Sequence, residues 1–242
     1  MEKRNPWAWI PSLYFAEGLP YVVVMTLSVI MYKRLGVSNT DIALFTSWLY
    51  FPWVIKPIWS PFVDLIKTKR WWIYSMQLLI GGGMAGVAFV LPGDFFLRFT
   101  LAFFWLMAFS SATHDIAADG FYMLGLTEEQ QAFFIGIRNT FYRVAMLTGQ
   151  GLLVMLAGLL EESTGRISFA WSLVFFVLAG TFIALALWHK YILPRPASDA
   201  QRTNITPHTI LVEFGNTFVS FFSKKGIVPA LLFMLSYRLV ES

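Results

Sequence analysis

The stretch LRFTLAFFWLMAFSSATHDIAADG, residues 97–120, is apolar for most of its length and then places three ionisable side chains within six positions. A helix that crosses a lipid bilayer needs about 20 mostly apolar residues, so this segment is long enough to span. His114, Asp115 and Asp119 are costly inside a membrane, where such residues normally face a cavity or pair with one another. The segment therefore predicts a membrane-spanning helix that carries functional polar groups.

The composition of the whole chain agrees with a membrane protein. Of the 242 residues, 57% are hydrophobic and only 13% are charged, whereas a soluble domain has about 25% charged residues. The absence of cysteine excludes disulfides and thiolate metal sites. The net charge of +4 is small and lies mostly in loops, which indicates contact with a lipid bilayer and no nucleic acid partner.

Five further segments are also long and apolar enough to span, and short polar connections separate them. The six predicted spans cover residues 7–32, 41–63, 71–92, 97–120, 132–160 and 168–192. We therefore expect an all-α integral membrane protein with a six-helix bundle over residues 1–192. A polar stretch at 193–225 is predicted to be a linker, and 226–242 begins a seventh apolar segment.

The distribution of basic residues predicts the orientation of the bundle, because cytoplasmic loops carry an excess of Lys and Arg. The side of the bundle that holds the N-terminus has Lys3, Arg4, Lys67, Lys69, Arg70, Lys190, Arg195, Arg202, Lys224 and Lys225. The other side has Lys33, Arg34, Arg98 and Arg166. We therefore expect the N-terminus and the linker in the cytoplasm.

Six spans, a cytoplasmic linker and the start of another span make up half of the plan of many secondary transporters. Those proteins join two six-helix halves around a substrate site near the middle of the membrane. We expect the chain to be a truncated or split N-terminal half, with the C-terminal six-helix half missing. A complete six-helix protein with a re-entrant tail is the alternative.

Ionisable residues inside the predicted spans are the candidates for function. Asp115 lies 11 residues before the turn near Leu126 and Arg138 lies 12 residues after it, so the two should have similar depth. Asp115 and Asp119 share a helix face, and Glu17 and Lys56 also fall near mid-depth. The sequence predicts an acid–base lining along helices 1, 2, 4 and 5. Pairs that only hold the helices together are the alternative.

Five motifs, found in order along the chain, resemble the N-terminal half of the AmpG muropeptide permeases of the major facilitator superfamily. They are FAEGLPYVVV (15–24), VIKPIWSPFVD (54–64), SSATHDIAADGFY (110–122), YRVAMLTGQG (142–151) and LSYRLVES (235–242). The loop DLIKTKR (64–70) also resembles the superfamily's element after helix 2, although Leu65 and Lys67 depart from its pattern. The motifs are specific as a set, and each alone is weak.

The resemblance implies an inner-membrane importer of anhydromuropeptides, a class of small glycopeptide solute, driven by the proton gradient and without a cofactor. The motif positions imply substrate contacts for Lys56, Trp59, Arg143 and Arg238. They imply a gating loop at Asp64, Lys69 and Arg70. The candidate proton-coupling network is Asp115, Asp119, His114, Arg138, Arg143 and Glu17.

Two of these candidates depart from the pattern, and three other functions compete with muropeptide import. His114 stands where the motif has Gln, and Glu17 replaces an uncharged residue, so a sugar, peptide or nucleotide-linked solute is one alternative. A non-transporting membrane sensor is another. His114 and Asp119 also fit an H-x-x-x-x-D acyltransferase spacing, but no nucleophile motif accompanies them. We therefore expect no enzyme, no catalytic residues and no metal site.

Overall fold

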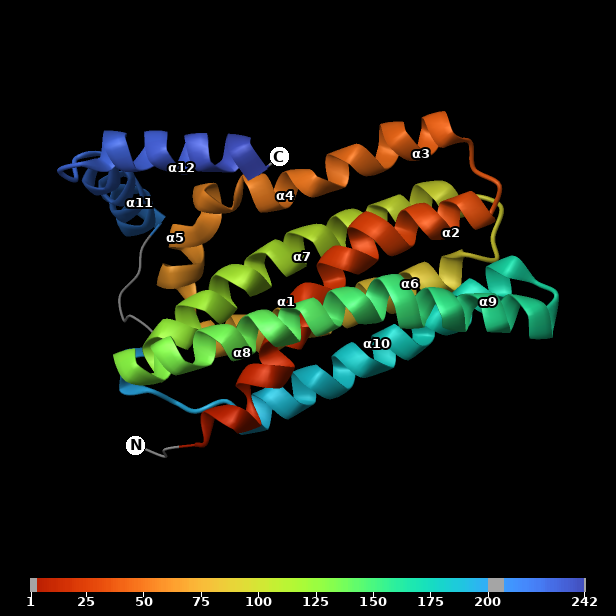
Figure 1. The fold of residues 1–242 in the computed structure, drawn as a ribbon, viewed down its shortest axis with the longest axis horizontal. Coiled ribbons are helices and arrows are strands. Elements are labelled where there is room, and N and C mark those ends of the chain that lie inside the picture. Colours follow the sequence, from red (N-terminus) through yellow and green to blue (C-terminus); the bar gives the residue numbers. More distant parts are fainter. Residues whose placement is uncertain (1–3, 200–206, 242) are drawn as a thin grey trace.

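The computed structural model describes residues 4–199 and 207–241, and these form helices and turns without any β-strand. Figure 1 shows an elongated bundle of antiparallel helices, with the N-terminus and the chain after α10 at the same end. The expected all-α fold is therefore confirmed. We call this end, with the turns at 67–68 and 126–127 and residues 193–199, the linker end.

Five helical stretches are long and apolar enough to cross a membrane, and they match five of the six predicted spans. The first runs over Pro6–Arg34 and contains η1 (Pro6–Ala8), α1 (Ile10–Val22), the π-helical turn η2 (Val23–Leu27) and α2 (Ser28–Arg34). Two single helices follow, α6 (Lys69–Val90) and α7 (Phe96–Gly125). The others are α8 (Glu128–Leu147), a second π-helical turn η4 (Thr148–Leu152) with α9 (Leu153–Thr164), and α10 (Ile167–Ile192).

The second predicted span, 41–63, is divided into short helical pieces and is not among the five stretches that are long and apolar enough to cross. Residues 39–66 divide into α3 (Asn39–Thr46), η3 (Ser47–Tyr50), α4 (Phe51–Val54) and α5 (Lys56–Ile66). Prolines at 52, 57 and 61 lack the N–H that an unbroken helix needs. The helix breaks at Ile55, and α5 leaves the direction of α4 steeply (Figure 1).

The region after α10, predicted to be a linker, contains η5 (Ala197–Asp199) and α11 (Pro207–Phe222). The predicted seventh segment contains α12 (Ile227–Glu241). Phe214–Phe222 and Ile227–Met234 meet at an angle of 87° and together are long and apolar enough for one further crossing. The ring of Phe214 lies 5.4 Å from that of Phe62, which holds α11 against α5.

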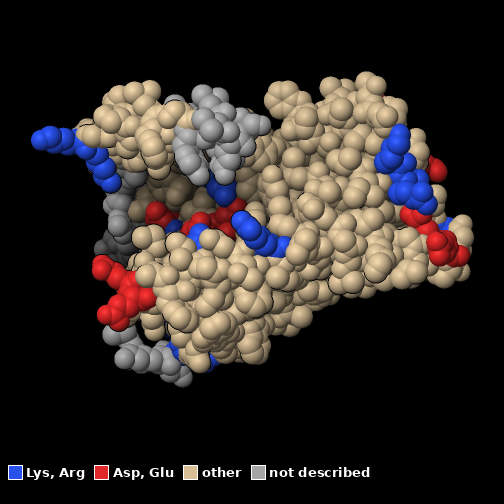
Figure 2. Space-filling model, in the orientation of Figure 1, with Lys and Arg blue, Asp and Glu red and all other residues tan. Residues whose placement is uncertain are grey.

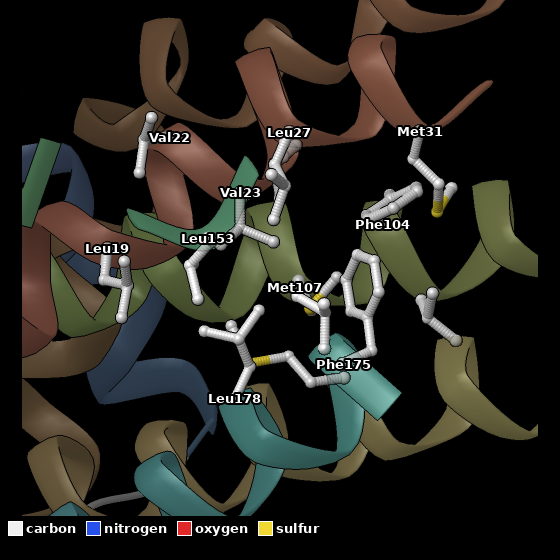
Figure 3. Packing of buried hydrophobic residues seen from close by; sticks show 14 of the residues in the cluster. Leu19, Val22, Val23, Leu27, Met31, Phe104, Met107, Leu153, Phe175 and Leu178 are labelled. Carbon is white, nitrogen blue, oxygen red and sulfur yellow. The ribbon is translucent and has the colours of Figure 1, made fainter. Parts of the chain in front are cut away.

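The larger of two buried apolar clusters lies in the half of the bundle away from the linker end, and the smaller lies near the linker end. Helix α6 packs between α7 and α10, and α1 packs against α7 and α8. Figure 3 shows side chains meeting in the larger cluster, the apolar core, from Leu19, Val22, Val23, Leu27, Met31, Phe104, Met107, Leu153, Phe175 and Leu178. The two π-helical turns contact each other, and a Cβ at Gly149 of η4 would overlap Cγ1 of Val22. The close approach of helix 1 to η4 therefore depends on this glycine.

On the face that Figure 2 shows, charged side chains gather at the two ends of the molecule and in a hollow near one end, and most of the remaining surface is uncharged. At the end away from the linker, Glu161 binds the guanidinium of Arg34 and accepts a hydrogen bond of 2.8 Å from Nε1 of Trp171. Nε of Arg34 lies 3.0 Å from Oε2 of Glu161. These bonds fasten the end of helix 1 to α9 and α10.

Candidate functional site

The first ion pair of the candidate site joins the break in the second span to α7. Lys56 is the first residue of α5, and its Nζ lies 2.6 Å from Oδ2 of Asp115. The Asp115 residue is only 9% exposed, and its second carboxylate oxygen, Oδ1, is buried without a hydrogen-bond partner in the described part of the chain. The lysine thus compensates the charge of a buried carboxylate that is otherwise poorly solvated.

The second ion pair lies one helical turn further along α7, toward the linker end. Nη1 of Arg138, on α8, lies 3.1 Å from Oδ1 of Asp119 and donates a hydrogen bond of 3.1 Å to Oη of Tyr14. Tyr14 in turn donates to Oδ1 of Asp119 over 3.3 Å. The guanidinium also lies 4.7 Å from the ring centre of Tyr14 and 5.1 Å from that of Tyr122, which adds cation–π attraction.

Glu17 of α1 faces both pairs but belongs to neither. Its residue is 8% exposed, and Oε2 is buried without a hydrogen-bond partner among residues 4–199 and 207–241. The charges that act on it are those of Asp115, Asp119, Arg138 and Lys56. Helices 1, 2, 4 and 5 of the predicted bundle therefore bring five of the candidate residues together.

The ion pairs differ from those that the predicted depths of the residues favour. Asp115 and Arg138 are at similar counts from the turn, yet Arg138 binds Asp119 and leaves Asp115 to Lys56. Counting residues from the turn compares the heights of side chains on two helices but does not show how each helix is rotated relative to the other. The aspartates are one turn apart, so a small difference in direction decides which of them each base reaches.

His114 lies on a different side of α7 from the ion pairs. Its Nε2 is 2.9 Å from Nε2 of Gln77, and Oε1 of Gln77 is 2.9 Å from Nδ1 of His189. Nε2 of His189 is 2.9 Å from Oγ of Ser12. This buried chain of hydrogen bonds joins α7, α6, α10 and α1. It was not predicted from the sequence. Gln77, the one amide within the predicted span 71–92, was the available signal.

Two other candidates, Arg143 and Trp59, lie apart from the ion pairs, and a third, Arg238, cannot be placed. Arg143 is exposed, and no ion pair to it occurs in the described portion of the chain. Trp59 is partly buried, with its ring centre 5.6 Å from that of Phe109 on α7. Arg238 falls in α12, and its side chain lies outside the described residues.

The predicted gating loop forms a compact polar cluster at the linker end. Lys69 is buried and binds the carboxylate of Asp64, while the guanidinium of Arg70 donates to the carbonyl oxygen of Lys190. Asp199, which no sequence pattern indicated, accepts the backbone N–H groups of Lys69 over 2.7 Å and of Arg70 over 3.1 Å. Burial raises the pKa of the Asp199 carboxyl above its ordinary range, although the two backbone donors act in the opposite direction.

Two open cavities reach the ion pairs from the linker end, where Figure 2 shows acidic and basic side chains in a hollow. One, of about 700 Å³, lies between α5, α7 and η5 and is lined by Asp119 and by the polar cluster. The other, of about 600 Å³, lies between α5, α11 and α12 and is lined by Lys56. Ser60, Asp64 and Ile116 line both. The site is thus accessible to a solute or to water.

The arrangement suits ion pairing and proton binding. Three carboxyl groups and two bases meet in a partly buried space between four helices, so breaking one pair exposes a charge that a proton or a charged solute can compensate. In residues 4–199 and 207–241 no three histidine, aspartate or glutamate side chains are placed to hold a metal ion.

Comparison with known proteins finds a family model and several relatives that match most of the chain. A family model described as the BT1 family matches residues 16–215. An anhydromuropeptide permease of Escherichia coli (strain K12) is 26% identical over 237 residues, which cover 95% of this chain and 45% of that protein. An uncharacterized protein of Haemophilus influenzae is 26% identical over 94% of this chain and 52% of its own length. An uncharacterized membrane protein of Saccharomyces cerevisiae is 28% identical over 50% of this chain. The chain spans about half the length of the first two.

Proposed function

Because this chain belongs to the BT1 family, we propose that it forms the N-terminal half of a proton-coupled secondary transporter of the major facilitator superfamily. The proposed solute is an anhydromuropeptide-like cell-wall fragment, imported across the inner membrane. The proposed orientation has the N-terminus and the linker in the cytoplasm. The similarity to the Escherichia coli permease, over 95% of the chain, supports the choice of solute class.

The observation that carries the proposal is the presence of two ion pairs, Lys56–Asp115 and Arg138–Asp119, which join α5 and α8 to α7 and so connect three different spans. Charged residues in a membrane normally mark the path of a solute or of protons. The cavities that reach these pairs open toward the linker end, and the opposite end is closed by the apolar core and by the Arg34–Glu161 pair. This asymmetry supports a state open on one side, as alternating access requires.

The proposed roles follow from chemistry and position. Lys56 is exposed enough at the 600 Å³ cavity to bind a carboxylate of the peptide part of the solute once Asp115 releases it. Arg143, which is exposed and forms no ion pair with the described residues, would contribute a second carboxylate contact if the C-terminal half of such a transporter closes over it. Asp64, Lys69 and Arg70 would hold the linker end together and open it as the halves move.

Uptake of labelled anhydromuropeptide by vesicles that contain the full-length protein tests this function. We expect accumulation when an inward proton gradient is imposed and none when a protonophore dissipates it. Uptake of the same extent with and without the gradient would reject proton coupling. No uptake of muropeptide, combined with gradient-driven uptake of a sugar, a peptide or a nucleotide-linked solute, would reject the proposed substrate.

A further inference from the structure

The site holds one carboxyl group more than it holds bases. Lys56 is engaged with Asp115 at 2.6 Å, and Arg138 is engaged with Asp119 at 3.1 Å. Glu17 remains without a base of its own among the described residues, although it lies in the same group of charges. An ionised Glu17 would give the site a net negative charge.

The surroundings of Glu17 disfavour such a charge. The residue is 8% exposed, and Oε2 has no donor in the part of the chain that the structure describes. From α7 the carboxylates of Asp115 and Asp119 face it, from α5 the ammonium of Lys56, and from α8 the guanidinium of Arg138 and the phenol of Tyr142. Tyr14 lies one turn away on its own helix. A buried carboxylate with two negative neighbours and no cation of its own is costly.

We propose that Glu17 is the carboxyl group that binds the transported proton, and that it is protonated in the state that the structure shows. The inference rests on the proposed function, since it names the proton-binding residue of that transporter. Binding forms an O–H bond on the Glu17 carboxylate with a proton taken from water. Release returns that proton to water when Lys56 or Arg138 leaves its aspartate and compensates Glu17 instead.

The geometry gives this exchange a route. Tyr14 bridges Asp119 and Arg138, and Asp119 lines the 700 Å³ cavity, so a change at the Arg138 pair is communicated to the face of α1 that carries Glu17. When both bases stay with their aspartates, the proton stays on Glu17. When a carboxylate of the solute draws a base away from its aspartate, the charges around Glu17 are redistributed and its proton affinity changes.

Infrared difference spectroscopy on the full chain in lipid tests the assignment without any solute. A protonated carboxyl group has a C=O stretching band that a carboxylate lacks, and this band shifts in D2O. We expect the band at neutral pH in the unaltered protein and its loss in Glu17→Gln. The matched control is Glu162→Gln, on the exposed surface of α9, which should retain the band. A band that persists in Glu17→Gln, or that is absent from the unaltered protein, overturns the inference.

A second variant covers the case in which Glu17→Gln does not fold. Glu17→Asp keeps a carboxyl group, so the band should remain at a shifted frequency, and an unchanged frequency would count against Glu17.

Uptake in vesicles separates this inference from the proposed function. If Glu17→Gln loses gradient-driven accumulation but retains solute exchange, both stand. If it still accumulates solute with the gradient, Glu17 is not the proton site, although the transporter function holds. If the band depends on Glu17 but no solute is accumulated, the protonation of Glu17 stands, and both the proposed function and the role of Glu17 in transport fail.

Discussion

Nζ of Lys56 lies 2.6 Å from Oδ2 of Asp115, so the first residue of α5 is fastened to the middle of α7. Ile55, just before it, has φ of −93° and ψ of 9°, outside the helical range. The ion pair therefore fixes the direction in which α5 leaves the break. Separation of the pair would free the part of the second span that lines both cavities.

Removal of either partner of this pair should destabilise the protein. Lys56→Met leaves Asp115 buried without its cation, and Asp115→Asn leaves the ammonium of Lys56 without its anion. We expect each change to lower the free energy of unfolding by about 1–3 kcal/mol, the cost of a polar group that loses its partner. The double variant should lose less than the sum of the two, measured by denaturant unfolding in detergent. Strict additivity would mean that the two residues do not interact.

Arg138 and Arg143 lie five residues apart, and the structure gives them different surroundings. Arg138→Ala removes the contacts to Asp119 and Tyr14 and should lower the free energy of unfolding by about 1–3 kcal/mol. Arg143→Ala, on the exposed side, should change it by less than about 0.5 kcal/mol. Thermal unfolding followed by circular dichroism compares the two variants. Equal losses would contradict the assignment of Arg138 to the network.

Two glycines of η4 offer a test of the contact between helix 1 and helix 5 of the bundle. Gly149→Ala would place its Cβ against Val22, and we expect a loss of about 1–3 kcal/mol from overpacking. Gly151→Ala, two residues later, meets nothing within 4 Å and serves as the control. Unfolding midpoints of both variants in the same detergent measure the difference. A midpoint for Gly149→Ala as high as that of Gly151→Ala would show that the helices can separate at little cost.

The polar cluster at the linker end should make stability depend on pH through Asp199. Its pKa is raised by burial in the folded state, so folding favours the protonated carboxyl. The contribution of Asp199 to stability is complete below the pKa of the unfolded chain and is lost as the pH rises through the raised pKa. Relative to Asp199→Asn, the unaltered protein should therefore lose stability as the pH rises.

Thermal midpoints measured over a series of pH values give this comparison. Asp94→Asn is the control, because Asp94 is exposed at the opposite end of the bundle. A difference between the unaltered protein and Asp199→Asn that stays constant with pH would contradict the assigned cause.

The apolar runs of the sequence predict most of the bundle, since an unbroken run of this length has few alternatives to a spanning helix. The second span shows the limit of this reasoning. Pro52 and Pro57 indicate that the helix is distorted, but a helix can accommodate either proline as a kink. The packing of α5 against α7 and α11 determines where the helix breaks. The result is a lysine placed at the break, which the sequence alone does not indicate.

The sequence predicts which residues belong to the candidate site but not which acid pairs with which base. Glu17, Lys56, Asp115, Asp119 and Arg138 are conspicuous because they are charged within apolar segments. Adjacent residues of a helix point about 100° apart, so His114 and Asp115 face different neighbours, and the sequence does not show which helices pack on each face. Asp199 could not be predicted, because a single aspartate in a polar stretch belongs to no recognisable pattern. It binds the backbone at the start of α6 only because the folded chain places it there.

The two π-helical turns, Val23–Leu27 and Thr148–Leu152, have a consequence for the comparison of homologous sequences. Each such turn accommodates about one residue more than a regular α-helical turn. In a homologue with a regular α-helix at either position, the residues that follow would occur one position earlier in the sequence if they are to face the same direction. Alignments of such homologues should therefore permit single-residue gaps at 23–27 and at 148–152, inside membrane spans where gaps are normally penalised. An alignment without them would match the lipid-facing residues of one protein with the core residues of another.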